Sequence, residues 1–93
     1  MNKIIAVIPA YNVEKKIKDV IQRIPNDSVN EIIVVDDGSK DQTYNIAIST
    51  GVKVIKHEIN KGYGAAQKTG FKEALNDGAD IIILLHSDGQ HAP

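Results

Sequence analysis

Two short polar segments of this chain have the residue types of a ligand or metal site, and each follows an apolar run. Asp36 and Asp37 come directly after the run at 31–35, and Asp88 comes just after the run at 79–85. A strand that delivers a carboxylate to the rim of a sheet is the usual way in which an α/β protein builds such a site. Both segments are therefore candidates for binding chemistry.

Asp88 is the leading candidate for a metal ligand. Hard divalent cations such as Mg²⁺ prefer oxygen ligands and bridge to phosphate oxygens, which suits a carboxylate at this position. His86 and Gln90 lie close enough in sequence to join or support the site. The alternative is a simple turn, because Gly89 follows Asp88 and Asp-Gly is a common turn pair.

The adjacent carboxylates of Asp36 and Asp37 repel each other, and a turn does not need both. Nucleobase edges and ribose hydroxyls donate hydrogen bonds, and a carboxylate accepts them. We therefore predict that Asp37 hydrogen-bonds a nucleotide. A turn or helix-capping role stays open for Asp36 and Ser39, since Asp and Ser favour both positions.

A glycine-rich segment at 60–66 opens a predicted helix. Free amides at a helix start attract anions, so Lys61 and Gly62 are candidates for contacts with a diphosphate. The steric alternative is that the glycines let the helix begin close to a sheet. Tyr11 could stack on a base, and Glu14 lies one turn into the first predicted helix; both also have structural alternatives.

Short apolar runs rich in β-branched residues predict buried parallel strands at 4–8, 31–35, 52–56 and 79–85. Pro9 is expected to end the first strand. Helical spacing predicts three intervening helices. The first is capped by Asn12 and closed by Pro25, the second is capped by Ser39 or Asp41, and the third spans 63–76. Their inward faces carry Val13, Ile17, Val20, Ile21 and Ile24; then Tyr44, Ala47 and Ile48; then the small residues Ala66, Gly70 and Ala74.

The order βαβαβαβ predicts an α/β fold, with a Rossmann-like parallel sheet, right-handed crossover helices and strand order 3-2-1-4. The topological switch then lies between strands one and four, and ligands bind at the carboxyl ends of strands beside it. The loops at 9–12 and 86–88 meet there, and the Asp36-Asp37 pair lies one strand away.

The composition of the chain excludes several classes of function. The chain has 93 residues, enough for one small domain over 1–93, with net charge −1 and no cysteine. Nucleic-acid binding has no electrostatic support, and thiolate zinc sites are excluded. No signal-peptide pattern and no apolar run of membrane-spanning length is present. We therefore expect a cytoplasmic protein.

Four ordered segments resemble family 2 glycosyltransferases of the GT-A fold. They are 7–12, 33–41, 60–66 and 88–93, and together they cover essentially the whole chain. The chain is particularly similar to the branch that contains dolichyl-phosphate mannose synthase and related polyprenyl-phosphate sugar transferases. The resemblance implies the amino-terminal part of a truncated GT-A fold that binds a UDP- or GDP-linked sugar.

The resemblance also implies roles for individual residues. Asp37 would bind the base, and Asp88, supported by Gln90, would hold Mg²⁺ or Mn²⁺ on the diphosphate. His86 departs from the family's frequent Asp-x-Asp motif, and a neutral imidazole supplies no charge. The predicted substrate-binding set is Pro9, Ala10, Tyr11, Asn12, Glu14, Asp37, Lys61 and Gly62, and the predicted metal set is Asp88, Gln90 and His86.

By the same resemblance, the whole enzyme transfers the sugar with inversion to an acceptor such as polyprenyl phosphate, at the cytoplasmic face of a membrane. No catalytic residue is expected within this chain, so we expect it to bind donor without catalysing transfer. Its fourth strand would be an open edge that invites a homodimer. The alternatives are a non-catalytic or degenerate nucleotide-binding module, a receiver-like domain and a sugar nucleotidyltransferase. A receiver-like domain would carry paired acidic residues after the first strand, and a sugar nucleotidyltransferase would carry a Gly- and Arg-rich loop there. Both features are missing from this sequence.

Overall fold

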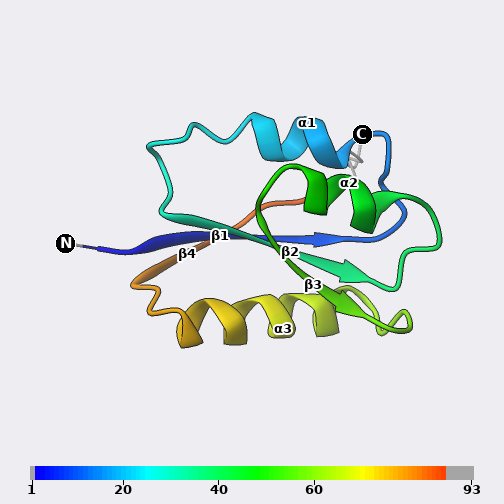
Figure 1. The fold of residues 1–93 in the computed structure, drawn as a ribbon. Coiled ribbons are helices and arrows are strands. Elements are labelled where there is room, and N and C mark those ends of the chain that lie inside the picture. Colours follow the sequence, from blue (N-terminus) through cyan, green and yellow to red (C-terminus); the bar gives the residue numbers. More distant parts are fainter. Residues whose placement is uncertain (1, 88–93) are drawn as a thin grey trace, which may run out of the picture.

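The computed structural model describes residues 2–87, which form a four-stranded parallel sheet. The strands are β1 (Ile4–Ala10), β2 (Glu31–Asp37), β3 (Lys53–His57) and β4 (Ile81–Leu84). Their spatial order is β3-β2-β1-β4, which confirms the predicted order (Figure 1). Every paired strand is parallel, so the carboxyl ends of all four point toward one edge of the molecule.

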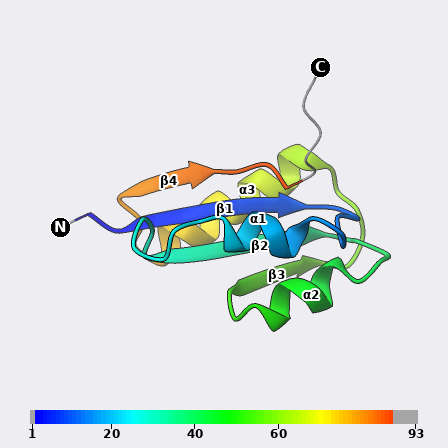
Figure 2. The ribbon, with the colours of Figure 1, turned by 90° about the horizontal axis from the view of Figure 1, so that it is seen from above.

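Three helices cover the two faces of the sheet. Helices α1 (Ile17–Gln22) and α2 (Thr43–Ser49) lie on one face, and α3 (Tyr63–Asn76) lies on the other, as Figures 1 and 2 show from perpendicular directions. Within residues 2–87, each helix is too short or too polar to span a bilayer.

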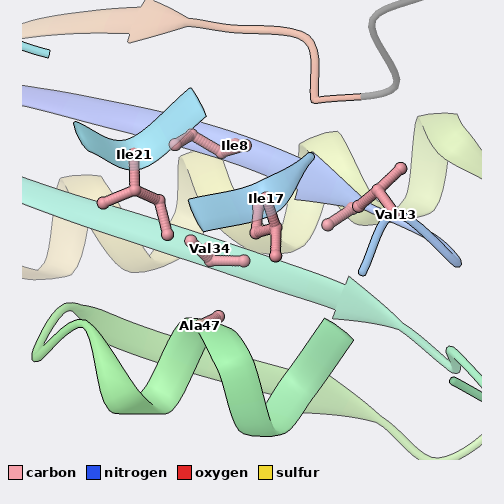
Figure 3. Packing of buried hydrophobic residues seen from close by; sticks show 7 residues of the cluster. Ile8, Val13, Ile17, Ile21, Val34 and Ala47 are labelled. Carbon is pink, nitrogen blue, oxygen red and sulfur yellow. The ribbon is translucent and has the colours of Figure 1, made fainter. Parts of the chain in front are cut away.

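The hydrophobic core is divided between the two faces because successive side chains of a strand point in opposite directions. Ile8 and Val34 point toward α1 and α2, where they meet Val13, Ile17, Ile21 and Ala47 (Figure 3). Their neighbours along the strands, Val7 before Ile8 and Val35 after Val34, belong to the second cluster, which includes Ala66 and Ala74 of α3. Covering on both faces explains why β1 and β2 read as continuous apolar runs.

The prediction that Pro9 ends the first strand is wrong, because β1 continues through Ala10. The carbonyl of Val7 accepts a hydrogen bond from the Leu85 N–H, and the carbonyl of Pro9, two residues on, accepts one from Ser87 Oγ. Pro9 therefore faces the β4 side just past the last residue of that strand. A missing N–H leaves no gap in the ladder there, so proline is tolerated.

The first helix is shorter than predicted, and Asn12 does not cap it. Asn12 has a left-handed backbone, with φ of 51°, and its side-chain carbonyl accepts the Lys40 N–H at 2.9 Å. That loop contact occupies the Asn12 side chain, and the helix begins at Ile17, with Lys16 at the N-cap. Val13 is still buried beside Ile17 and Ile21, so the predicted apolar face survives.

The inward face of the second helix also differs from the prediction. Ile48 is 45% exposed, and Ile46 packs on the core beside Ala47 instead. The predicted N-cap residues Ser39 and Asp41 do not occupy that position, which is Gln42 and has no side-chain cap hydrogen bond. Asp41 lies one residue earlier, and its Oδ1 accepts the Thr43 N–H at 2.9 Å. Ser39 has another role, since its Oγ accepts the Asn12 N–H.

The small face of the third helix is confirmed, and Gly70 is its tightest point. A Cβ atom at Gly70 would collide with Val7 Cγ1 and come within 3.2 Å of Val35 Cγ2. The α3 backbone therefore lies almost directly on β1 and β2. This close approach sets the height at which the helix start meets the end of the sheet.

We expect Gly70→Ala to lower the free energy of unfolding by about 1–2 kcal/mol, since overpacking outweighs the better helix propensity of alanine. Gly64→Ala is the matched control, because a Cβ there meets nothing within 4 Å; it should be neutral or stabilising by up to about 1 kcal/mol. Urea unfolding measures both. In a double-mutant cycle, Val7→Ala should recover part of the Gly70→Ala loss, and strict additivity would contradict this explanation.

Candidate functional site

A cavity of about 370 Å³ lies at the carboxyl ends of the strands, where the predicted polar loops meet. Its walls come from the end of β1, the end of β2, the start of α3 and the segment after β4. The lining residues are Pro9, Ala10, Tyr11, Asp37, Asn60, Gly62, Tyr63, Ala66, His86 and Ser87. A larger cavity of about 520 Å³ lies at the other end of β2, but ligands of parallel sheets bind at carboxyl ends.

Asp37 is the centre of the hydrogen bonding at this cavity, although only 3% of it is exposed. Its Oδ1 accepts hydrogen bonds from His57 Nδ1 at 2.8 Å and the Lys61 N–H at 2.9 Å. Its Oδ2 accepts from Asn60 Nδ2 at 3.0 Å and the Gly62 N–H at 2.9 Å. Two bonds to each oxygen use the ordinary acceptor capacity of a carboxylate.

These contacts keep Asp37 ionised. Burial alone would raise the pKa of the Asp37 carboxyl, but hydrogen bonds from His57, Lys61 and Gly62 outweigh it and hold the pKa below its ordinary value. The site thus contains a fixed negative charge that anchors the backbone in front of α3.

Asp36 is completely buried on the opposite face of the sheet, and it has the turn-forming role that the sequence left open for it. Its Oδ1 accepts the Ser39 N–H at 3.2 Å, which closes the turn after β2 around Gly38. Gly38 has φ of 75°, and a Cβ there would lie 2.5 Å from the Asn60 nitrogen. The β2 turn and the loop before α3 therefore touch through backbone atoms.

Asn12 and Glu14 connect two loops and do not line the cavity. The Asn12 N–H donates to Ser39 Oγ at 2.8 Å, and Glu14 Oε1 accepts the Gln42 N–H at 3.0 Å. Lys61 is exposed and contributes its N–H to Asp37. Of the predicted substrate-binding residues, the cavity gathers Pro9, Ala10, Tyr11, Asp37 and Gly62.

His86 lies at the cavity mouth, paired with an aromatic ring from α3. Tyr63 and His86 stack with ring centroids 5.7 Å apart, and Tyr63 Oη lies 2.8 Å from His86 Nδ1. Next to it, Ser87 is fixed by its hydrogen bond to the Pro9 carbonyl. The predicted metal ligands Asp88 and Gln90 lie outside the described residues, and residues 2–87 contain no cluster of three acidic or histidine side chains that could hold a metal.

Sequence reasoning missed His57, Asn60 and Tyr63 as contributors to this site. His57 is the last residue of β3 and pairs in register with Asp37 across two parallel strands. Aligning the predicted strand ends at 35 and 56 places His57 opposite Asp36, one residue from its partner, so only the observed register brings His57 to Asp37. No comparable signal marked the contact between Tyr63 and His86, which are 23 residues apart.

The chain resembles known proteins along nearly its whole length. The family model of glycosyl transferase family 2 matches residues 5–93. A UDP-N-acetylglucosamine–dolichyl-phosphate N-acetylglucosaminyltransferase of Methanococcus voltae is 45% identical over 94% of this chain and 41% of its own length. A dolichol-phosphate mannosyltransferase of Pyrococcus furiosus is 37% identical over 98% of this chain and 27% of its own length. The chain thus spans well under half of these relatives.

Solved structures match as well. Glucosyl-3-phosphoglycerate synthase from Mycobacterium tuberculosis, in complex with Mn²⁺, UDP and glucosyl-3-phosphoglycerate, has a TM-score of 0.75 and 30% identity over 92% of this chain and 33% of its own. S. aureus TarS in complex with UDP-GlcNAc has a TM-score of 0.78 and 29% identity over 92% and 26%. These matches confirm the predicted GT-A fold.

We expect Asp37→Asn to lower the free energy of unfolding at pH 7 by about 2 kcal/mol, because the NH₂ group of the asparagine side chain would face the N–H donors that now bond to the carboxylate. The pKa of the Asp37 carboxyl is lower in the folded state than in the unfolded state, so the folded protein binds fewer protons at this group. The ionised carboxylate therefore stabilises the folded state above pH about 4, and this stabilisation is lost as the pH falls through the folded-state pKa. The difference between wild type and Asp37→Asn should therefore shrink in acid. Urea unfolding from pH 7 to pH 2 measures it.

Asp27→Asn is the matched control, because Asp27 is exposed in a loop away from the cavity. It should leave the free energy of unfolding within about 0.5 kcal/mol of wild type at every pH. A gap between wild type and Asp37→Asn that stayed constant down to pH 2 would contradict the ionised, donor-saturated state of Asp37.

Proposed function

The chain belongs to glycosyl transferase family 2, and we propose that it forms the donor-binding portion of a glycosyltransferase. In this proposal residues 1–93 make up one structural portion that binds a UDP- or GDP-linked sugar. The observation that carries the proposal is the cavity at the carboxyl ends of β1, β2 and β4, beside the topological switch of the sheet.

The residues around the cavity have the chemistry that a nucleotide requires. Tyr11 is 44% exposed, so its ring offers a face for a base. The amino end of α3, a helix of 14 residues, adjoins the cavity through Tyr63, and helix starts favour phosphate. Asp37 is the predicted acceptor for the base. Since four internal donors already occupy its carboxylate, a bond to the base would replace one of them. Two of these donors line the cavity, and Asn60 donates from a side chain that can rotate away, whereas Gly62 donates from the backbone.

The residue types that follow β4 in the sequence are suitable ligands for a divalent cation. A carboxylate at Asp88 and an amide oxygen at Gln90 are the oxygen ligands that Mg²⁺ and Mn²⁺ prefer, and the preceding Ser87 is held at the cavity wall by Pro9. His86 Nδ1 is occupied by Tyr63, which leaves Nε2 as its remaining ring nitrogen. When bound, the cation would neutralise charge on the departing diphosphate.

For the whole protein, we propose transfer of the sugar with inversion from the nucleoside diphosphate to a polyprenyl phosphate. The supporting observation is that relatives along the full chain are named for dolichyl phosphate and undecaprenyl phosphate. Residues of this chain bind and orient the donor, and none of them is assigned as the catalytic base. We propose that the reaction takes place at the cytoplasmic face of a membrane, because a polyprenyl phosphate acceptor is a lipid.

We also propose that the edge strand β4 is a pairing surface for a homodimer. Ile81 and Ile83 are exposed on this strand, which forms one edge of the sheet. Unpaired backbone groups with apolar side chains at an edge favour addition of another strand.

The second candidate function is a nucleotide-binding module without catalytic activity. The observation that favours it is His86, which is stacked and hydrogen-bonded to Tyr63 at the place where the family often carries an acidic metal ligand. Binding of a nucleotide without any gain from metal would support this candidate.

We expect UDP or GDP to shift the backbone amide resonances of Tyr11, Asp37 and Gly62 together in ¹H–¹⁵N spectra, and more strongly when Mg²⁺ is present. Mn²⁺ should broaden resonances near His86 and Ser87 only when nucleotide is bound. Asp88→Asn should abolish both this broadening and the stronger shifts seen with Mg²⁺. The nucleotide that shifts these amides identifies the base. A dispersed spectrum in which nothing moves at millimolar nucleotide would contradict donor binding by this chain.

We expect Tyr11→Leu to weaken nucleotide binding about fivefold or more, because stacking of a base on an aromatic side chain is worth about 1–3 kcal/mol. Tyr44→Leu is the matched control. Tyr44 lies on α2, where its ring contacts the Lys56 ammonium and does not line the cavity. Isothermal titration of each variant with the nucleotide that binds wild type measures the effect. Equal weakening by both substitutions would contradict a stacking role for Tyr11.

A further inference from the structure

His57 has both ring nitrogens engaged in the interior of the protein, next to the cavity but outside its lining. Its Nδ1 lies 2.8 Å from Asp37 Oδ1, and its Nε2 lies 2.8 Å from Thr69 Oγ1 on α3. Only 8% of the residue is exposed. A buried imidazole with two hydrogen bonds from different elements has a fixed position and orientation.

The chemistry of the partners sets the direction of these bonds. The Asp37 carboxylate is ionised and only accepts, so Nδ1 of His57 carries the proton and donates. In the neutral ring, Nε2 then accepts from the Thr69 hydroxyl, which is able to serve either as donor or as acceptor. The chain of bonds from Thr69 through His57 to Asp37 is therefore fully satisfied.

Asp37 passes this constraint on to the cavity wall. The oxygen that His57 binds also holds the Lys61 N–H, and the other oxygen holds the Gly62 N–H and the Asn60 side chain. Gly62 has φ of 101°, a conformation that glycine adopts readily, and directly precedes α3, so rotation of the Asp37 carboxylate would remove the hydrogen bond that holds this turn at the helix start. Asn60 and Gly62 both line the cavity.

We propose that His57 is a positioning residue of the donor site: locked between Thr69 and Asp37, it holds the Asn60–Gly62 loop in the shape that receives the nucleotide. The expected effect of His57 on nucleotide affinity rests on the proposed donor-binding function. The holding of the loop itself is a property of the unliganded protein and is measurable without nucleotide.

The first experiment is amide hydrogen exchange by NMR on the full chain without nucleotide. In His57→Phe, which keeps a ring but loses both bonds, exchange at Lys61 and Gly62 should accelerate about tenfold or more relative to the sheet amide of Val34. His57→Asn should restore most of the protection, because its amide nitrogen reaches the position of Nδ1. Thr69→Val should accelerate exchange at the same two amides, whereas the matched control Thr50→Val, whose hydroxyl bonds only the Ala47 carbonyl, should not.

The second experiment is titration of the same variants with UDP and GDP in the presence of Mg²⁺. His57→Phe should raise the Kd of the binding nucleotide about tenfold, and His57→Asn should return it to within about threefold of wild type. Unchanged exchange at Lys61 and Gly62 in both His57→Phe and Thr69→Val would overturn the proposal, as would equal acceleration at Val34. If His57→Phe does not fold, Thr69→Val and His57→Asn decide the question. Failure of wild type to bind either nucleotide would overturn the donor-binding function, and the exchange experiment would still decide the role of His57.

Discussion

The site depends on one buried carboxylate. Asp37 lies at the end of a central strand with almost no exposure, and an ionised carboxylate is stable there only if donors surround it. Four donors do so, from the last residue of β3 and from the loop before α3. Satisfying one charge therefore joins β2, β3 and α3 at the carboxyl-end edge of the sheet, which is the edge where parallel sheets in general bind ligands.

The packing of α3 makes this arrangement possible. The helix lies close to the sheet because its inward face is Ala66, Gly70 and Ala74. At that distance Thr69 reaches His57, and the backbone before the helix reaches Asp37. Small residues in the middle of the helix thus determine the geometry at its amino end, where the cavity lies.

The local signals in the sequence predicted the elements and their order well, and failed where a loop contact competed with local preference. Runs of β-branched residues identified all four strands, and alternation with helices led to the order 3-2-1-4. The prediction for Pro9 fails because the tolerance of proline there depends on where the neighbouring β4 ends. The prediction that Asn12 caps the first helix fails because its side chain binds the loop at Lys40, 28 residues away. Helical spacing alone predicts an inward Ile48, whereas the short α2 presents Ile46 to the core.

By itself, the sequence determined the fold class, the edge of the sheet at which the polar loops meet, and the resemblance to a nucleotide-sugar transferase family. These follow from the period of apolar residues and from motifs that are contiguous in the chain. Only the tertiary structure decided which groups saturate Asp37, that His57 supports it from behind, and that Tyr63 pairs with His86. Those partners are 20 to 25 residues apart along the chain. Their contacts arise from strand register and from the depth at which α3 packs, neither of which a local pattern encodes.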